Sequence, residues 1–289
     1  DLSNAHDLLL ALLPELVPHE RAIWERDLVM NRRGIQVDTD LARRASAMST
    51  ALVDDLNVRL RTMTGGAVSK ASRMAEIKQY LTAHGIAVPT KVGGDGEDKE
   101  TLDKAALLDL MGRADLPQKV REVIEVRQQA GKATSTAKYA KAVEMVCPDG
   151  RVRGATQYHG AHTGRDGGRL LQLQNFPKGF KAKDQAAAVA MILAGDTAAF
   201  SAKYGVKAMS ALSDSLRALV IAAPGKTLVR ADYNSIELCV EMWLADDRAT
   251  LGQLRRGEKP YVEMAQFIYS NPKIRKPTDE DGTYAAEYD

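Results

Sequence analysis

Apolar residues recur at three- and four-residue intervals through the first half of the chain, which is the spacing of one face of an amphipathic helix. The pattern predicts a helix over residues 7–34 that ends at Gly34, then a short extended piece, "IQVD". A second helix is expected over 39–63, with Asp38 as its N-cap and the following "TGG" as its end.

Three more helical segments complete this half of the chain. Residues 69–85 predict a helix capped by Ser69 or Ser72 and closed by its final glycine. The glycine-rich polar stretch "KVGGDGEDKE" predicts a mobile loop. Helical spacing then returns over 100–111 and 117–146.

The pattern changes at Cys147. Residues 147–179 combine turns, glycines and short alternating stretches, which predict strands joined in hairpins. Helix is expected again over 183–219, and "APGKTLVRADYN" then predicts a turn and a strand that ends at an acid. From Ser235 onward the apolar positions again follow helical spacing.

Composition is that of a globular protein. Among 289 residues, 45% are hydrophobic and 27% charged, and no apolar run approaches the ~20 residues that span a bilayer. No signal peptide heads the chain, and its start at Asp1 rather than Met predicts a piece of a protein or a processed product. Two distant cysteines, Cys147 and Cys239, form neither a disulfide framework nor a metal-ligand pattern, so we expect a cytoplasmic location.

Charge is informative in its distribution rather than its total. The net charge is +2, but residues 117–183 are rich in Lys and Arg and poor in acids, whereas the last dozen residues are acidic. A locally basic stretch can hold a phosphate backbone even when the whole chain is nearly neutral.

The stretch "ADYNSIELCVEMWLADD" carries two acids with competing interpretations. Asp232 at the end of a strand is suited to bind a hard cation such as Mg²⁺, but it could also be the N-cap of the following helix. Glu237 falls in the first helical turn, where it would either interact with the helix dipole or face a ligand at the end of the strand.

A second candidate site is the loop "YHGAHTGRDGGRLLQLQNFPKG". Arg165 and Arg169 suit phosphates and base edges, and Gln174 and Asn175 can donate to minor-groove acceptors. The two histidines of this loop, His159 and His162, suggest a metal, but no third ligand has a suitable spacing.

A third candidate is "GKATSTAKYAK". Its lysines and hydroxyl groups, among them Lys132, Thr134 and Lys138, could bind phosphates. A solvated helix end is the alternative interpretation of this stretch taken alone.

Taken together and in order, these stretches resemble family A DNA polymerases, the group of bacterial DNA polymerase I and its phage relatives. "DYNSIEL" looks like motif A of the family, and "HTGRDGGRLLQLQNFP" is similar to its upstream TGR and LQN segment. "MNRRGIQVD", "KATSTAKY" and "PDGRVRGATQ" resemble its linker, thumb and palm hairpin. The residues of these motifs are nearer to those of the phage branch, and the resemblance covers essentially the whole chain. It implies an α+β, right-hand polymerase fold with a mostly helical thumb and part of an antiparallel palm sheet.

The resemblance implies a role for each motif A residue. Asp232 would be the catalytic residue that binds two Mg²⁺ ions, assisted by the carbonyl of Tyr233. Ser235 and Ile236 would line the nucleotide pocket, and Glu237 would be the steric gate that excludes a ribose 2′-hydroxyl.

The resemblance also implies partners and DNA contacts. The expected partners are primer–template DNA, a dNTP and a C-terminal polymerase segment, in a bacterial or phage-infected cell. Arg165 would reach the primer end through the minor groove. The residues expected to contact DNA are Lys132, Thr134, Lys138, Arg165, Arg169, Gln174 and Asn175.

The chain departs from the family pattern at several points. Cys239 stands where the family usually carries an arginine, and neither a fingers motif nor the second catalytic aspartate of motif C is found. An exonuclease domain is also absent. We therefore expect this chain alone not to polymerise.

By resemblance, the expected domains are a helical linker (1–40) after a missing exonuclease domain, a thumb (41–146), the first part of a palm (147–250) and a truncated start of the fingers (251–289). A non-catalytic primer–template-binding module, or one half of a split polymerase, is the alternative. An unrelated helical phosphohydrolase is a third hypothesis, for which more acids and histidines would be expected near Asp232.

Overall fold

A computed structural model describes residues 17–92, 94, 96–178, 182–229, 231–233, 235–258 and 260–271. The chain divides into two compact units, Asp1–Leu228 and Val229–Asp289. The first unit is mostly helical and carries small two-stranded antiparallel sheets, so the predicted α+β class is confirmed. The division between the units, after Leu228, does not coincide with any of the three boundaries between the four domains expected from the resemblance, and those domains stay a prediction.

The first predicted helix boundary is present where the sequence places it. Helix α2 (Pro18–Arg33) ends at Gly34, which has φ +69° and allows the chain to turn into strand β1 (Ile35–Gln36). A Cβ at Gly34 would lie 2.8 Å from the carbonyl oxygen of Val152, so only glycine fits this close approach. The part of the expected helix before residue 17 lies outside the described residues.

Helix α3 (Thr39–Met63) forms the spine of the first unit. Asp38 caps it as predicted, accepting a hydrogen bond from the Leu41 amide at 2.9 Å. One face of α3 is buried along its whole length, by residues spaced three or four apart. These residues are Leu41, Ala42, Ala45, Met48, Leu52, Leu56 and Leu60.

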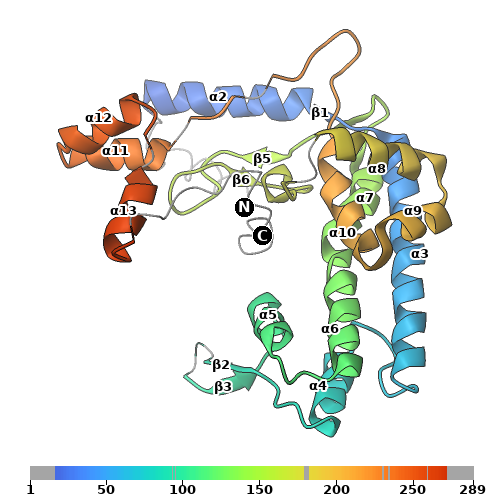
Figure 1. Ribbon diagram of the computed structural model, residues 1–289. Helices are drawn as coiled ribbons and strands as arrows, with labels where there is room; N and C mark the ends of the chain where they lie inside the picture. The colour runs from blue at the N-terminus through green and yellow to red at the C-terminus, as the bar shows by residue number, and fades with distance from the viewer. Residues whose placement is uncertain are drawn as a thin grey trace, which may run out of the picture. The chain divides into compact units, whose positions relative to one another are not determined.

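The far end of α3 leads into a small helical and hairpin region (Figure 1). Helix α4 (Met74–Ala83) has no side-chain cap, so the predicted Ser69 and Ser72 caps are wrong. The main-chain N–H and the hydroxyl of Ser69 instead both donate to the Glu76 carboxylate at 2.7 Å. The predicted mobile loop contains an antiparallel hairpin, β2 (Thr90–Val92) with β3 (Asp98–Glu100), before α5 (Lys104–Gly112).

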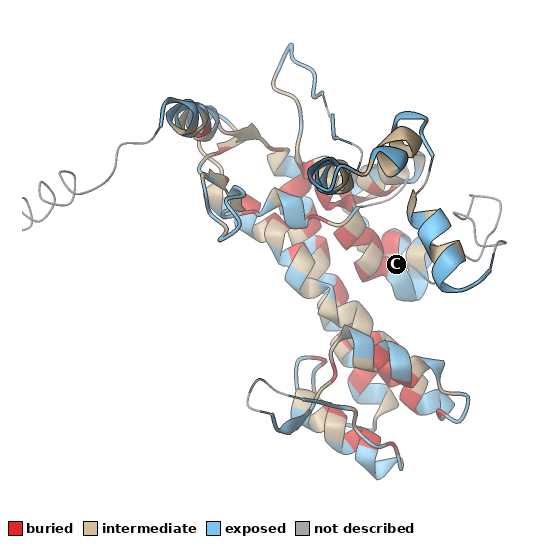
Figure 2. Cartoon of the chain, turned by 90° about the vertical axis from the view of Figure 1, so that its left-hand side faces the viewer, coloured by how far each residue is buried: buried red, intermediate tan, exposed pale blue. Residues whose placement is uncertain are grey.

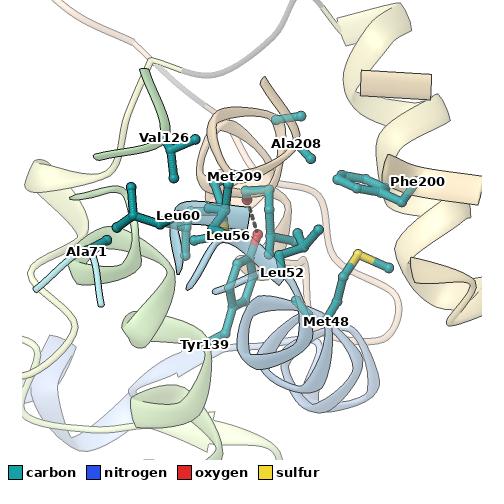
Figure 3. Packing of buried hydrophobic residues seen from close by; sticks show 14 of the residues in the cluster. Met48, Leu52, Leu56, Leu60, Ala71, Val126, Tyr139, Phe200, Ala208 and Met209 are labelled. Carbon is teal, nitrogen blue, oxygen red and sulfur yellow. Dashed lines mark hydrogen bonds between the residues drawn. The ribbon is translucent and has the colours of Figure 1, made fainter. Parts of the chain in front are cut away.

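Helices α6 (Gln118–Gly131) and α7 (Ala133–Met145) run beside α3 and bury its apolar face (Figures 1 and 2). Tyr139 of α7 is fully buried, and its hydroxyl donates to the Leu212 carbonyl at 3.0 Å (Figure 3). The polar end of a buried tyrosine requires such a partner. This bond therefore joins α7 to α10 inside the core.

The predicted region of short strands is confirmed. Strand β4 (Arg151–Val152) pairs with β1, and β5 (Thr156–Gln157) pairs antiparallel with β6 (Gly167–Gly168) before the 3₁₀ turn η1 (Leu173–Asn175). Only β5 and β6 among the described strands of this region form a hairpin, since β4 pairs with the distant strand β1. The remainder of the first unit is helical, as predicted, but it is broken into short segments. These are α8 (Ala182–Ala194), α9 (Thr197–Tyr204), η2 (Gly205–Lys207), α10 (Ala208–Asp214) and η3 (Ser215–Leu219).

The described residues of the second unit form α11 (Ile236–Leu244), α12 (Arg248–Arg255) and α13 (Pro260–Ile268). The predicted strand before Asp232 is wrong, because residues 227–229 and 231–233 form no regular structure. A strand needs a hydrogen-bonded neighbour, and the described residues pair none with this segment. Leu228 and Val229 are accordingly 59% and 90% exposed rather than packed in a sheet.

Candidate nucleic-acid interface

The start of α7 presents one face to solvent and one to the core. Lys132 forms the joint between α6 and α7 and is exposed, as is Thr134, whose hydroxyl donates to the Gly131 carbonyl at 2.9 Å. Thr136 is buried and bonds the Ser49 hydroxyl at 2.7 Å, so it is not available to a ligand. The hydroxyl-rich segment is therefore divided between a structural and a solvent-facing role.

Lys138 connects this helix to the second candidate segment. Its ammonium donates to the Asn175 carbonyl at 3.2 Å and lies 5.1 Å from the centre of the buried Phe176 ring. Burial lowers the pKa of Lys138, because it disfavours the charged form. Two predicted DNA-contacting segments thus lie side by side in one compact unit.

The segment after β6 is held in a defined shape. Gln172 adopts a left-handed conformation with φ +47°, and its side-chain oxygen accepts a hydrogen bond from the Asn175 amide at 3.0 Å. Arg217 of η3 donates to the carbonyl of Pro177 at 2.5 Å and to that of Phe176 at 3.4 Å. These bonds fix the turn that exposes Gln174 and Asn175.

Glycines allow close packing within the β5–β6 hairpin. A Cβ at Gly160 would lie 2.6 Å from the Cα of Gly167, and the side-chain amide of Gln174 occupies the position that a Cβ at Gly168 would need. The two sides of the hairpin can therefore approach closely, and Gln174 lies directly over β6.

The hairpin loop presents the two predicted arginines. Arg165 is exposed, and its carbonyl accepts a hydrogen bond from the Ala161 amide at 3.0 Å, which closes the loop. Arg169 is also exposed, and its guanidinium donates to the side-chain oxygen of Gln157. All seven residues expected to contact DNA belong to the first unit, and all but the partly buried Lys138 are exposed.

The histidines of this loop give no support to a metal site. His159 lies 3.7 Å from the Glu20 carboxylate, with its ring against that of Tyr158. Across the described part of the chain, no group of three or more His, Cys, Asp or Glu side chains could hold a metal ion.

Sequence reasoning missed the residues that attach the hairpin to α2. Asp27 of α2 is buried and accepts hydrogen bonds from Thr156 of β5 at 2.6 Å and from Asn31 at 3.0 Å. The available signal was an acid on the apolar face of a predicted helix, near Trp24 and Leu28.

The candidate catalytic residues lie in the second unit. Asp232 is exposed, four positions before the first residue of α11, and the N-cap is Ser235, so the capping interpretation of Asp232 is wrong. Ser235 has φ +53° and does not cap with its side chain. Ile236 and Glu237 are exposed in the first turn, which places Glu237 where the sequence predicts it.

The donor set at motif A fits one side of a magnesium site. Mg²⁺ is bound through one or two carboxylates, carbonyl oxygens, water and substrate phosphates. Asp232 offers an exposed carboxylate and Tyr233, 81% exposed, an adjacent carbonyl. Among the described residues, Asp232 belongs to no group of three or more His, Cys, Asp or Glu side chains that could hold the ion without further ligands.

Comparison with known proteins agrees with the resemblance in the sequence. No family model matches the chain. It is 29% identical over 259 residues to a DNA polymerase of Bacillus phage SP02, a match that covers 89% of this chain and 37% of the phage protein.

A solved structure shares the fold. It is the POL domain of Pol1 from M. smegmatis in complex with DNA primer-template and dNTP, matched with a TM-score of 0.59 at 18% identity over 86% of this chain and 37% of that one. The predicted resemblance to family A DNA polymerases is thus confirmed. The chain spans just over a third of the length of each of these proteins.

None of the described helices is long and apolar enough to cross a membrane.

Proposed function

We propose a function from the premise that this chain resembles family A DNA polymerases in sequence and in fold. The chain binds primer–template DNA and supplies one carboxylate for template-directed DNA synthesis. The observation that carries the proposal is the contact between Lys138 and Asn175. It brings the basic start of α7 beside η1, and Gln174 of η1 lies in turn against Gly168 of β6, the strand that follows the Arg165 loop.

The proposed DNA grip relies on complementary chemistry. Lys132 and Lys138 supply ammonium groups, and Arg165 and Arg169 supply guanidinium groups, for the phosphate oxygens. The amides of Gln174 and Asn175 can donate to minor-groove acceptors, which are present in every base pair. Such a surface binds duplex DNA with little sequence preference.

The proposed chemistry is nucleotidyl transfer at motif A. Asp232 and the Tyr233 carbonyl would hold Mg²⁺, which when bound stabilises the charge that develops on the transferring phosphoryl group. Ser235 and Ile236 would line the nucleotide pocket. Glu237 would exclude a 2′-hydroxyl by occupying its volume, so that selectivity comes from a clash.

We infer that a further polymerase segment, with the second carboxylate and a fingers helix, completes the enzyme, because the 289 residues contain neither motif. The chain alone would then bind DNA without extending a primer. Its working environment would be the cytoplasm of a bacterial or phage-infected cell.

A non-catalytic primer–template-binding module is the second candidate. It is favoured by one observation: the predicted DNA-contacting residues all lie in the first unit, whereas Asp232 lies in the second. On this proposal the first unit would bind DNA without needing Asp232. Nucleotide addition after the completing segment is supplied distinguishes the enzyme from the module.

The test of the DNA grip is fluorescence anisotropy of a labelled primer–template duplex titrated with this chain at several salt concentrations. Counterion release predicts an affinity that falls steeply with salt, with a slope of about −0.9 per phosphate contact in a plot of log affinity against log salt. An affinity for duplex DNA that does not change with salt concentration, or no binding at low salt, would contradict the proposal. Arg44→Ala, which removes an exposed arginine of α3 paired with Asp40, is the control.

A further inference from the structure

Helix α2 is joined to the β5–β6 hairpin by a closed set of hydrogen bonds. The Thr156 hydroxyl donates to one carboxylate oxygen of Asp27 at 2.6 Å, and the Asn31 side-chain amide donates to the other at 3.0 Å. Asn31 also donates to the Thr156 carbonyl at 3.0 Å and accepts from the Thr156 amide at 3.2 Å. Every polar group of Thr156 is thereby satisfied by α2.

The burial of Asp27 makes this attachment specific. Asp27 is only 7% exposed, and it is the one acid among the buried polar side chains of the described residues. A buried carboxylate is tolerated where donors satisfy it, and removing a donor or the charge leaves polar groups unpaired away from water. Thr156 is therefore confined to one position relative to α2.

The same helix is attached to this region at both ends. At its C-terminus, Arg153 donates to the Arg32 carbonyl at 2.8 Å and Arg151 donates to the Arg33 carbonyl at 3.2 Å. Near its N-terminus, Glu20 accepts a hydrogen bond from the Tyr158 hydroxyl. Helix α2 thus acts as a rigid support for the segment 151–158.

Position is transmitted from Thr156 to the Arg165 loop through the hairpin. Thr156 pairs with Gly168 and Gln157 with Gly167. The loop that carries Arg165 lies between these pairs. Because these two pairs join β5 to β6 at the base of the loop, a shift of β5 displaces both ends of the loop.

We propose that Asp27 is a positioning residue for DNA binding: through Asn31 and Thr156 it holds the β5–β6 hairpin in the orientation in which Arg165 meets the DNA. This inference rests on the proposed function for its DNA-binding half. Asp27 itself touches no DNA in this proposal and acts only through the hairpin.

The test combines amide hydrogen exchange with duplex-DNA binding in the whole chain. Asp27→Asn keeps the size of the side chain but replaces an acceptor with a donor, and Thr156→Val removes the hydroxyl while keeping the shape. Glu25→Gln, an exposed acid of α2 paired with Arg21, is the matched control. Loss of a charge-assisted hydrogen bond predicts that the amides of 156–169 exchange about tenfold faster in both variants, with the α3 and α7 amides unchanged.

The binding readout separates positioning from general stability. In both variants duplex affinity should fall by about threefold to tenfold, and the fall should be smaller in an Arg165→Ala background, where only Arg169 and Gln174 remain to be displaced with the hairpin. Unchanged exchange of the hairpin amides in both variants would overturn the proposal, as would an additive loss of binding in the Arg165→Ala background. No duplex binding by the unsubstituted chain would overturn the proposed function, while the exchange data still decide whether Asp27 holds the hairpin.

Discussion

The ammonium of Lys138 and the main-chain carbonyl of Asn175 are 3.2 Å apart, although 37 positions separate the residues in the sequence. An ammonium carries three donors, and this bond uses one of them. Lys138 can therefore hold η1 in place and still present donors to a phosphate. The same ammonium lies 5.1 Å from the centre of the buried Phe176 ring, and this contact limits the freedom of the side chain before any ligand binds.

Lys138→Met should weaken duplex binding and lower the salt slope by about one, because one phosphate contact is lost while the packing on Phe176 is kept. Anisotropy titrations over a range of salt concentrations measure both quantities. Lys119→Met removes an exposed lysine from α6 as the control. An unchanged salt slope would show that Lys138 contacts no phosphate and has only a structural role.

Tyr139→Phe should lower the free energy of unfolding by about 1–2 kcal/mol, because the buried Leu212 carbonyl loses its donor. Burial also raises the pKa of the Tyr139 phenol far above its ordinary value, so the hydroxyl stays a donor across the accessible pH range. Urea unfolding measures the change, with the 65% exposed Tyr261→Phe as control. Equal effects of the two substitutions would contradict the structural role of this bond.

Asp149 should give the chain an acid-dependent component of stability. Arg153 binds both carboxylate oxygens, at 3.0 and 2.6 Å, and this hydrogen bonding lowers the pKa of Asp149 from 3.8 to about 2. A lowered pKa in the folded state stabilises the protein fully above 3.8, and the contribution is lost as the pH falls through about 2.

The urea midpoint of Asp149→Asn should therefore lie below that of the unsubstituted chain near neutral pH, and the gap should close as the pH falls from 3.8 to about 2. Asp40→Asn, which removes another exposed acid paired with an arginine, controls for surface charge. A gap that stays constant down to the lowest pH would mean that the Arg153 pair does not contribute as described.

Glu237→Ala should raise ribonucleotide incorporation by the completed enzyme far more than it lowers deoxynucleotide incorporation. In the proposed role Glu237 excludes the 2′-hydroxyl by its bulk, so removing that bulk would remove the clash. A helix-dipole role predicts a loss of only ~0.3–1 kcal/mol of stability and unchanged sugar selectivity. Catalytic efficiencies for both sugars, measured beside a melting curve, separate the two, and Glu241→Ala, one turn further along α11, is the control.

Local signals in the sequence predicted the helical part of the first unit well. The end of α2 at Gly34, the Asp38 cap and the end of α3 each depend on a few neighbouring residues, so the sequence alone determines them. The Ser69 cap failed because the Glu76 carboxylate, seven positions further on in the first turn of α4, binds that serine instead. A cap motif in the sequence does not indicate whether the serine has a competing hydrogen-bond partner of this kind.

Long-range relationships were harder to predict. The expected strand before Asp232 is absent because strand formation depends on a pairing neighbour, which the local apolar pattern does not specify. Asp27 and Thr156 are 129 positions apart, so the bond that seats the hairpin could not be found by inspecting either stretch. The resemblance to known polymerases identified the candidate site residues, and the structure contributed the way in which α7, η1 and the hairpin come together.

The most direct test of the central claim uses Asp232→Ala in the completed polymerase. Single-turnover kinetics measure nucleotide addition by this variant, and fluorescence anisotropy measures its affinity for primer–template DNA. The account predicts that nucleotide addition is nearly abolished while duplex affinity is kept, because the carboxylate and the DNA-gripping residues lie in different units. Asp109→Ala, an exposed acid of α5, should leave both unchanged. Retention of most of the turnover by Asp232→Ala would contradict the assignment of this residue as the metal-binding carboxylate.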